Sequence, residues 1–266
     1  MKIHPTAIID PTAEIDSTAA VGPYAVIGPE VRIGAGCEIG PHAVISGPTT
    51  MGAGNRIGAF ASIGGDPQDL KFQGERVELV MGDNNTIREY VSIHRGTASG
   101  HRRTTIGSDN LFMAYAHVAH DCVIGNRVIL ANAATLGGHV EIADKATLGG
   151  LVAVHQFTRI GAHAYIGGMS GISKDIPPYI IVAGIRNQMR VTGINKVGLQ
   201  RSGFDEETIR KLSKAFRIIF RTPGLLLEEA LEKVQAELPD CGPVQHLVAF
   251  FRSSSRPVVR ASGHGE

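Results

Sequence analysis

Histidine is the residue type that points to chemistry in this chain of 266 residues. Of its eleven histidines, four lie in one stretch: His117, His120, His139 and His155. Near neutral pH an imidazole can accept a proton from a hydroxyl group, which makes histidine the commonest general base. His120 is followed directly by Asp121, and a neighbouring carboxylate can hold an imidazole in one orientation. This stretch is therefore predicted to carry an acid–base site.

A six-residue repeat determines where these side chains lie. An aliphatic residue recurs every sixth position over residues 3–63 and again over residues 106–172, and a small residue commonly stands two positions before it. Neither an α-helix nor an alternating strand has a period of six, whereas three six-residue units make one coil of a triangular solenoid. The repeat predicts a left-handed parallel β-helix. Glycine often follows the aliphatic residue, which predicts a positive φ at that glycine.

Because one coil holds eighteen residues, the positions of the histidines within the coils can be compared. His120, His139 and His155 follow aliphatic residues that lie eighteen apart, by two, three and one positions respectively. They are expected to stack near one corner of three successive coils. Gly138 stands just before His139, where its backbone N–H could face a developing oxyanion.

The repeat also divides the chain into domains. An all-β solenoid is expected over residues 1–190, with two loop excursions at 64–80 and 95–104, and a C-terminal α-helical domain over residues 191–266. Loops on a rigid scaffold often carry function, so both excursions are candidate parts of the site. Helices are expected from Asp205 to about Arg221, from residues 222–223 to about 238, and from residues 242–243 onward.

The first of these predicted helices has two opposite faces. The apolar face holds Ile209, Leu212, Phe216, Ile219 and Phe220, and the basic face holds Arg210, Lys214, Arg217 and Arg221. A basic face is most often simply solvated. It is also the kind of surface on which an acidic protein would dock. Both interpretations stay open from the residues alone.

Bulk properties argue against several classes of protein. A formal net charge of +1 argues against a general nucleic-acid-binding protein. The three cysteines make no disulfide framework, and no apolar run could span a bilayer or serve as a signal peptide, so a cytoplasmic protein is expected. Solenoid walls are flat and offer no pocket, so a site should form where subunits meet, most simply in a homotrimer.

Three interpretations of the histidine cluster are open at this point. Outward histidines could merely form hydrogen bonds between coils. A zinc site is the second, since metal-dependent carbonic anhydrases share this solenoid; that resemblance requires a His-x-x-x-x-His pair, whereas the close pair here is His117 and His120. No metal is therefore predicted. The third interpretation is a metal-free acyl transfer with a histidine as general base.

Several local clusters make the third interpretation specific. They are Gln68-Asp69-Leu70-Lys71, Ile87-Arg88-Glu89, Ile93-His94-Arg95-Gly96-Thr97, Ala116-His117-Val118-Ala119-His120-Asp121-Cys122, and Gly138-His139 with His155-Gln156-Phe157. Together they closely resemble the UDP-N-acetylglucosamine O-acyltransferase family over nearly the whole chain. The resemblance implies a homotrimer without a cofactor. Its reaction would transfer an (R)-3-hydroxyacyl group from acyl carrier protein to the 3-hydroxyl of UDP-N-acetylglucosamine, the first step of lipid A synthesis.

The same resemblance implies roles for single residues. His120 matches the general base, Asp121 the residue that orients it, and Gly138 the backbone donor to the oxyanion. Contacts to the sugar and the acyl group are matched by Asp69, Lys71, His117, His139 and His155. The nucleotide contacts are matched by Gln156, Asn195 and Arg201, and the position that limits acyl-chain length by Gly168. The chain departs from the family at Val197 and Ser202, where Arg186 or Arg190 could substitute.

The acyl chain and the rival functions complete the expectations. Gly168 lies 48 residues beyond His120, which is about 2.7 coils and roughly 13 Å along the solenoid axis. Since an extended chain advances about 1.3 Å per carbon, hydroxyacyl chains longer than about ten carbons are expected. One rival activity is acylation of a UDP 3-amino sugar to give an amide. A non-enzymatic scaffold is the alternative class.

Overall fold

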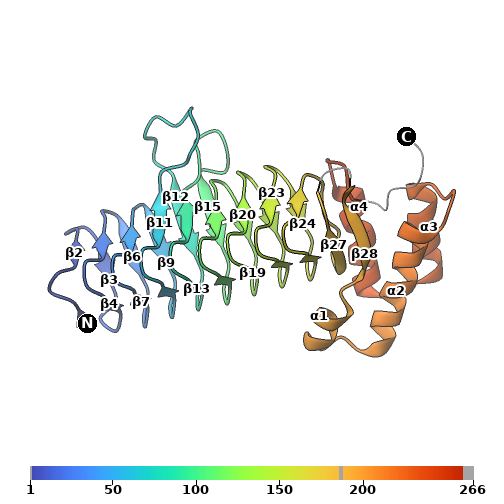
Figure 1. The fold of residues 1–266 in the computed structure, drawn as a ribbon, viewed down its shortest axis with the longest axis horizontal. Helices are drawn as coiled ribbons and strands as arrows, with labels where there is room; N and C mark the ends of the chain where they lie inside the picture. Colours follow the sequence, from blue (N-terminus) through green and yellow to red (C-terminus); the bar gives the residue numbers. More distant parts are fainter. Residues whose placement is uncertain (1, 186–187, 260–266) are drawn as a thin grey trace.

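A triangular coil of short parallel strands forms most of the molecule, and a helical unit closes one end of it (Figure 1). The computed structural model describes residues 2–185 and 188–259. Each strand pairs with its counterpart one coil on, so Lys2 faces Ala20 and Glu14 faces Arg32. The predicted left-handed parallel β-helix followed by helices is confirmed.

Three sheets make the three walls of the prism, and the chain visits them in turn. The first sheet contains β1 (Lys2–Ile3), β4 (Ala20–Val21), β7 (Glu38–Ile39), β10 (Arg56–Ile57), β13 (Thr86–Ile87), β16 (Leu111–Phe112), β19 (Ile129–Leu130), β22 (Thr147–Leu148), β25 (Tyr165–Ile166), β27 (Ile180–Ala183) and β28 (Arg190–Ile194). The second contains β2 (Ile8–Ile9), β5 (Val26–Ile27), β8 (Val44–Ile45), β11 (Ser62–Gly65), β14 (Ser92–His94), β17 (His117–Val118), β20 (Thr135–Leu136), β23 (Ala153–Val154) and β26 (Gly171–Ile172). The third contains β3 (Glu14–Ile15), β6 (Val31–Ile33), β9 (Thr49–Met51), β12 (Glu78–Met81), β15 (Arg103–Ile106), β18 (Val123–Ile124), β21 (Glu141–Ile142) and β24 (Arg159–Ile160).

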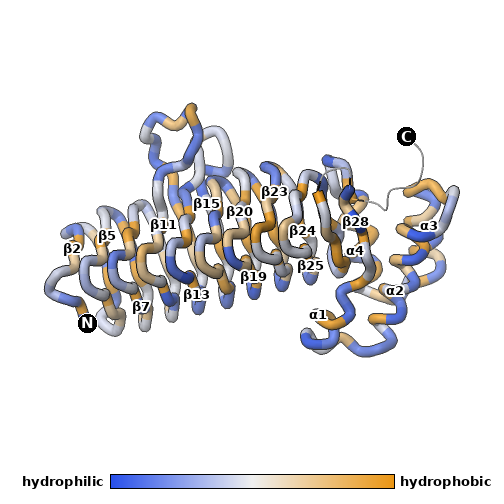
Figure 2. The backbone as a smooth tube through the Cα atoms, in the orientation of Figure 1, coloured by the Kyte–Doolittle hydropathy of each residue, from blue (hydrophilic) through white to orange (hydrophobic). Residues whose placement is uncertain are grey.

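The core lies inside the prism and is made by the repeat itself. The large hexad residues point inward, as the full burial of Ile45, Ile63 and Leu136 illustrates, and the small ones, such as Ala43 and Ala116, are equally buried. Full burial of one such aliphatic side chain contributes about 1.5–3 kcal/mol. In Figure 2 hydrophobic and hydrophilic segments accordingly alternate along every coil.

The three corners of the prism are left-handed turns. We call the junction between the first and second sheets the first corner, and the junction between the second and third sheets the second corner. Residues with positive φ occupy the first corner at Tyr24, His42, Phe60, Tyr90, Tyr115, Ala133, Leu151 and Met169, and the second corner at Glu30, Arg102, Asp121, His139 and Phe157.

The prediction of positive φ at the glycine after the aliphatic residue is wrong for the regular coils. Gly34 and Gly40 do not have it; positive φ falls two residues later, at Gly36 and His42. A Cβ on Gly34 would lie 2.5 Å from the carbonyl oxygen of Gly52 in the next coil. These glycines are therefore required by the close approach of stacked coils rather than by the bend.

Two loops leave the solenoid, and apart from a local irregularity between Ile63 and Gly65 the strands around them keep their register (Figure 1). Arg56 pairs with Thr86, thirty residues on, and Thr86 pairs with Leu111, twenty-five residues on. Since a regular coil takes eighteen residues, the first excursion adds twelve and the second adds seven. Regular strand ends at Gly65 and resumes at Glu78 in the first, and ends at His94 and resumes at Arg103 in the second.

The helical unit contains α1 (Lys196–Arg201), α2 (Glu206–Arg221), α3 (Leu227–Glu237) and α4 (Gly242–Ser253). The predicted starts of α2 and α4 are confirmed; Asp205 caps α2 by accepting a 2.7 Å hydrogen bond from the Thr208 N–H. The predicted start of α3 near residue 222 is wrong, because Gly224 adopts positive φ and the helix begins only after Leu226. The sequence analysis missed α1. None of the helices in the described part of the chain combines the length and hydropathy needed to cross a membrane.

Helix α2 joins this unit to the solenoid through its apolar face. The predicted apolar residues Ile209, Leu212, Phe216, Ile219 and Phe220 are all buried. Two of the four basic residues have structural partners: Lys214 lies 2.6 Å from Glu237 on α3, and Arg221 donates to the backbone oxygen of Val191. Arg210 and Arg217 take part in no ion pair among the described residues.

Candidate active site

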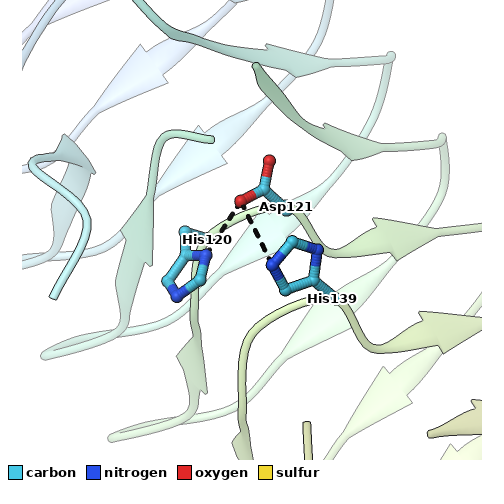
Figure 3. A group of neighbouring side chains, drawn as sticks. All are labelled: His120, Asp121 and His139. Atoms are coloured by element: carbon cyan, nitrogen blue, oxygen red, sulfur yellow. Dashed lines mark hydrogen bonds and ion pairs between the residues drawn. The ribbon is translucent and has the colours of Figure 1, made fainter. Parts of the chain in front are cut away.

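His120 and Asp121 form a hydrogen-bonded pair at the second corner (Figure 3). The His120 Nδ1–H donates to Asp121 Oδ2 at 2.8 Å. The carboxylate is completely buried, whereas the imidazole keeps 15% of its surface exposed. A buried carboxylate that holds Nδ1–H leaves Nε2 as the proton-accepting atom, which is the arrangement a general base requires.

His139 is the second histidine at this corner, eighteen residues beyond Asp121. Its Nε2 lies 3.7 Å from Asp121 Oδ2, and its ring is perpendicular to that of His120, with centroids 5.2 Å apart. On its other side it stacks on Phe157, one coil further on, at 4.4 Å. Burial lowers the pKa of His139, an effect that Asp121 partly offsets. His139 is thus a neutral ring beside the pair near neutral pH.

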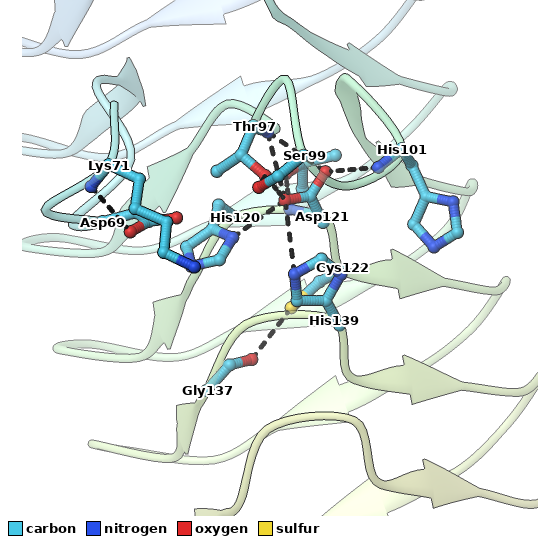
Figure 4. A network of polar contacts seen from close by, with 11 residues as sticks. Asp69, Lys71, Thr97, Ser99, His101, His120, Asp121, Cys122, Gly137 and His139 are labelled. Atoms are coloured by element: carbon cyan, nitrogen blue, oxygen red, sulfur yellow. Dashed lines mark hydrogen bonds and ion pairs between the residues drawn. The ribbon is translucent and has the colours of Figure 1, made fainter. Parts of the chain in front are cut away.

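The second excursion supplies further hydrogen bonds to Asp121 (Figure 4). The Thr97 hydroxyl donates to Oδ2 at 2.6 Å, and the Thr97 N–H lies 3.1 Å from both carboxylate oxygens. The His101 N–H donates to Oδ1 at 2.8 Å. Burial by itself would raise the pKa of Asp121, but the hydrogen bonds from His120 and Thr97 outweigh it and bring that pKa to about 2. Asp121 therefore stays ionised.

Gly138 and Gln156 lie above His120 in the same column of the second corner. A Cβ on Gly138 would come within 2.6 Å of the His120 ring, so no larger residue fits there without displacing the imidazole. The backbone of Gln156 in turn lies against Gly137, and the side chain of Gln156 is exposed. Gly138 N–H donates to no group in the described part of the chain, which leaves it free for a ligand.

His117 lies on β17, on the second sheet just before the pair. Its Nδ1 is 2.7 Å from the Ser92 hydroxyl, and its ring meets that of His94 edge to face at 4.8 Å. Burial lowers the pKa of His117; burial followed by the proximity of His117 lowers the pKa of His94 to about 4. Both rings are therefore neutral near pH 7.

The first excursion carries Asp69 and Lys71 over this corner (Figure 4). Asp69 accepts a 3.0 Å hydrogen bond from the Lys71 N–H and lies near enough to His139 to influence its pKa. The loop thus brings the Asp69 carboxylate near His120 and His139. Lys71 extends from the same turn of the loop.

The remaining predicted residues lie apart from the pair in this chain. His155 is exposed and makes a 3.1 Å contact with the Gln156 carbonyl. Asn195 caps α1, with its amide donating to the His163 carbonyl at 2.9 Å, and Arg201 is the exposed last residue of that helix. The predicted substitute Arg186 lies outside the described residues, whereas Arg190 begins β28.

Gly168 lies at the first corner, not the second. It stands beside Met169, and a Cβ on it would meet the Gly150 carbonyl of the preceding coil at 3.2 Å. Within a single chain, a path parallel to the solenoid axis from His120 therefore does not reach Gly168. The two residues flank the second sheet, so that a path between them crosses its face diagonally.

The same pair with His139 could also hold a metal ion. In the described part of the chain, His120, Asp121 and His139 bring three potential ligand atoms within 4.8 Å of one another. Two histidines and a carboxylate are ligand types of zinc sites. Asp121, however, already accepts hydrogen bonds from Thr97 and His101 at both oxygens.

Comparison with known proteins identifies the family. A family model described as UDP-N-acetylglucosamine O-acyltransferase, domain 2, matches residues 175–259, and one of bacterial transferase hexapeptide repeats matches 12–47, 30–65 and 103–138. The chain is 48% identical over 260 residues to the acyl-[acyl-carrier-protein]–UDP-N-acetylglucosamine O-acyltransferase of Anaeromyxobacter sp. (strain K), covering 98% of this chain and 100% of that protein. The chain belongs to the UDP-N-acetylglucosamine O-acyltransferase family.

Other members of the UDP-N-acetylglucosamine O-acyltransferase family agree with this assignment. The enzyme of that name from Myxococcus xanthus is 51% identical over 259 residues, with 97% of this chain and 99% of that protein covered. The crystal structure of the Francisella novicida UDP-N-acetylglucosamine acyltransferase matches with a TM-score of 0.93 at 38% identity, over 98% of this chain and 95% of that chain. The resemblance identified from the sequence clusters is confirmed.

Sequence reasoning did not assign the residues that surround the pair. Thr97 and His101 hold Asp121, Ser92 and His94 contact His117, and Phe157 supports His139. His94, Thr97 and Phe157 were within the clusters that carry the family resemblance, and Thr97 and His101 were within the predicted excursion. Their contacts span coils and an irregular loop, so spacing alone did not reveal them.

Proposed function

We propose that this protein transfers an (R)-3-hydroxyacyl group from acyl carrier protein to the 3-hydroxyl of UDP-N-acetylglucosamine. The observation that carries the proposal is the His120–Asp121 pair, with its buried carboxylate and partly exposed imidazole, in a chain that matches the family over its full length. The relatives named for this reaction support the choice of substrates.

In the proposed mechanism His120 Nε2 accepts the proton of the sugar hydroxyl as its oxygen attacks the thioester carbonyl. The tetrahedral intermediate carries an oxyanion, for which the unpartnered N–H of Gly138 is the proposed donor. Collapse of the intermediate breaks the carbon–sulfur bond, and the departing thiolate takes the proton from the His120 imidazolium. Asp121 stays ionised throughout and stabilises the imidazolium.

The surrounding residues are proposed to bind the substrates. Neutral His139 and His117 offer polar ring atoms to the sugar and the acyl group, and the first excursion brings Asp69 and Lys71 beside His120 (Figure 4). His155 and Gln156 extend the same corner toward the helical unit, where Asn195 and Arg201 are proposed to meet the nucleotide.

A homotrimer is proposed because these groups do not form one pocket within a single chain. Gly168 lies at another corner, and Asn195 and Arg201 lie beyond the last coil. Packing three prisms side by side would place corners of neighbouring chains against each other. The three free cysteines are buried and fit a reducing, cytoplasmic location. Light scattering of the purified protein should give three times the monomer mass of 28.2 kDa.

No metal is proposed to take part in the reaction, since Asp121 already uses both oxygens for hydrogen bonds within the chain. Activity should survive exhaustive dialysis against a chelator. Loss of activity that added zinc restores would instead assign His120, Asp121 and His139 as its ligands.

The acyl carrier protein is proposed to dock on the groove between β28, α1 and α2. This groove has a volume of about 750 Å³ and is lined by the basic residues Lys196, Arg210, Lys211, Lys214 and Arg217. Lys211 and Lys214 are paired with Glu207 and Glu237, so Lys196, Arg210 and Arg217 are the lining cations left for an acidic partner.

One incubation tests the proposed reaction. The protein is given hydroxyacyl carrier protein with either UDP-N-acetylglucosamine or the corresponding UDP 3-amino sugar, and the product bond is identified by its alkali lability. An ester formed with UDP-N-acetylglucosamine is expected. An amide formed only with the amino sugar would establish the alternative activity, and no product with either would leave the scaffold interpretation.

A further inference from the structure

The second excursion closes on a single side chain, that of Asp121. At its beginning, the Thr97 N–H and hydroxyl both donate to the carboxylate. At its middle, the His101 N–H donates to the other oxygen, and at its end the Thr104 hydroxyl accepts the N–H of Asp121 itself at 2.8 Å. Thr97 and Thr104 are almost fully buried. The loop thus contacts Asp121 from its beginning, its middle and its end.

Gly100 is the point of closest approach. A Cβ at this position would lie 2.5–2.6 Å from the Asp121 carboxylate carbon and from both of its oxygens. Its φ lies outside the left-handed region, so space alone requires glycine here. Any side chain at residue 100 would push the carboxylate toward the open side of the site.

The first excursion supports the second. The Gly96 N–H donates to the Glu78 carbonyl, and the Glu78 N–H donates to the Arg102 carbonyl, so β12 holds both ends of the second loop. Glu78 also pairs with Arg103, and Asp66 pairs with the largely buried Arg95. The conformation of the second excursion is therefore fixed by contacts on its far side, away from Asp121.

Asp121 Oδ2 has two imidazoles within reach. It accepts from His120 at 2.8 Å and lies 3.7 Å from His139 Nε2. A small rotation of the carboxylate would exchange these partners, because both ring nitrogens face the same oxygen. The bonds from Thr97 and His101 bind both oxygens from the opposite side and oppose this rotation.

We propose that Thr97 and Gly100 are positioning residues that direct Asp121 toward His120 rather than His139. Thr97 fixes the carboxylate by its hydroxyl, and Gly100 makes room for it. The inference rests on the proposed role of His120 as general base. Neither residue touches substrate in this account; both act through Asp121, and the same corner without the loop would present a carboxylate shared between two histidines.

The first experiment compares Thr97→Val with Thr97→Ser. Valine keeps the volume and removes the hydroxyl, so kcat should fall about 10- to 100-fold, by analogy with the loss of a partner that orients a metal-bound histidine. The KM values for both substrates should stay within about two-fold, since no substrate contact is lost. Serine should restore most of kcat. Thr49→Val is the matched control, because the Thr49 hydroxyl is equally buried and donates only to the Ser46 backbone.

The second experiment measures the tautomer of the His120 imidazole directly. In ¹⁵N spectra of histidine-labelled protein above pH 7, His120 should be the Nδ1–H tautomer in the wild type, and a mixture of tautomers in Thr97→Val and in Gly100→Ala. Gly242→Ala, where an added Cβ meets nothing within 4 Å, should leave both the spectrum and kcat unchanged. All variants are compared at the oligomer size of the wild type.

The outcomes separate this inference from the proposed function. If the His120 tautomer shifts in the variants but the protein never transfers an acyl group, the positioning role of Thr97 and Gly100 is supported and the proposed reaction is contradicted. Wild-type kcat and an unchanged tautomer in folded Thr97→Val and Gly100→Ala would overturn the inference and leave the general base untouched.

Discussion

The first and second corners of the prism have the same backbone and different chemistry. At both, non-glycine residues adopt positive φ in several successive coils, such as Tyr90 and Tyr115 at the first corner and Asp121 and His139 at the second. Along the first corner the rings of Tyr24, His42, Phe60, Tyr90 and Tyr115 stack on one another with centroids 4.8–5.2 Å apart and remain open to solvent. At the second corner Asp121 and His139 occupy the equivalent positions, and Asp121 is fully buried.

What differs is the chain that covers each corner. The described residues near the first corner form regular coils, whereas both excursions leave the solenoid at the second corner (Figure 1). A solenoid corner can present a histidine, as His42 shows, but it cannot desolvate the neighbouring carboxylate or supply its hydrogen-bond donors. The second excursion supplies donors from Thr97 and His101 to the buried Asp121, which is how one repeating backbone would yield the proposed reactive position at this edge.

The largest expected effect is at His120. Replacing it by alanine should lower kcat by about 10²- to 10⁴-fold, the range for loss of a general base. His42→Ala at the first corner is the matched control, because its ring also stands at a corner but only stacks between Tyr24 and Phe60. Steady-state kinetics of both variants check this. Equal kinetics for the two would remove the distinction between the corners.

The next prediction gives the first corner a part in specificity. A path from His120 to Gly168 rises about 13 Å along the solenoid axis and crosses the second sheet, which covers about four residues or roughly 13 Å. The resulting diagonal is about 18 Å long. At about 1.3 Å per carbon, an extended acyl chain of roughly fourteen carbons matches it. Gly168→Met should shift the preference to shorter chains, because the side chain would occupy the path. Competition between carrier proteins loaded with ten- and fourteen-carbon chains measures this preference. A Gly168→Met variant that still prefers the fourteen-carbon chain would contradict the prediction.

A third prediction concerns the basic groove, away from both corners. Reversing charge at Arg210 and Arg217 together should raise KM for the acyl carrier protein about ten-fold and leave KM for the UDP sugar unchanged. Lys233→Glu on α3 is the control, since Lys233 is not among the residues lining the groove. If KM for the acyl carrier protein is the same in the wild type, the Arg210/Arg217 double variant and Lys233→Glu, the basic face of α2 is merely solvated.

The fourth prediction is a pH dependence of stability from one buried and one half-buried histidine. The pKa values of His94 and His163 are both lowered to about 4, first by burial and next by the neighbouring charges of His117 and Lys145 respectively. The unfolded rings take up protons near pH 6.5, whereas the folded rings do not until about pH 4. Stability should therefore fall as the pH is lowered from about 6.5 toward 4.

Thermal unfolding between pH 6.5 and 5 measures this slope above the range in which carboxylates titrate. The double variant His94→Asn with His163→Asn should show a flatter dependence than the wild type. A wild-type Tm that stays constant over this interval would contradict the burial of the two rings.

The smallest effect is expected at the first corner. Tyr90 stacks between Phe60 and Tyr115, and such pairs contribute about 0.5–1.5 kcal/mol each, at the lower end when exposed. Tyr90→Ala should therefore lower Tm by only a few degrees. Its kcat should equal that of the wild type. A large loss of activity would show that the aromatic column serves the reaction.

The sequence allowed the fold to be predicted because the six-residue period is local and repeated. It located both excursions and the His120–Asp121 pair for the same reason. It also held information that was not used: His120 and Gly168 are 48 residues apart, which is not a multiple of eighteen, so the two could not share a corner. The position of positive φ was misjudged because glycine has a second use, close coil stacking.

The contacts of the second excursion could not be predicted from the pattern. Thr97 and Asp121 lie twenty-four residues apart, which is not a multiple of the eighteen-residue coil. The predicted start of α3 was wrong for a different reason. A proline near a helix start favours a new helix only where the following residues are helical, and Gly224, directly after Pro223, has a positive φ. The features that the repeat did not predict, namely the contacts to Asp121 and the start of α3, thus lie in irregular segments.

We infer that the second excursion makes the second corner reactive by acting through Asp121. A double-mutant cycle with Thr97→Val, Asp121→Asn and the combined variant tests it most directly. If Thr97 acts only through the carboxylate, the combined variant should have a kcat within about two-fold of Asp121→Asn alone. Losses that multiply in the combined variant would show that Thr97 acts independently of Asp121, and would contradict the account.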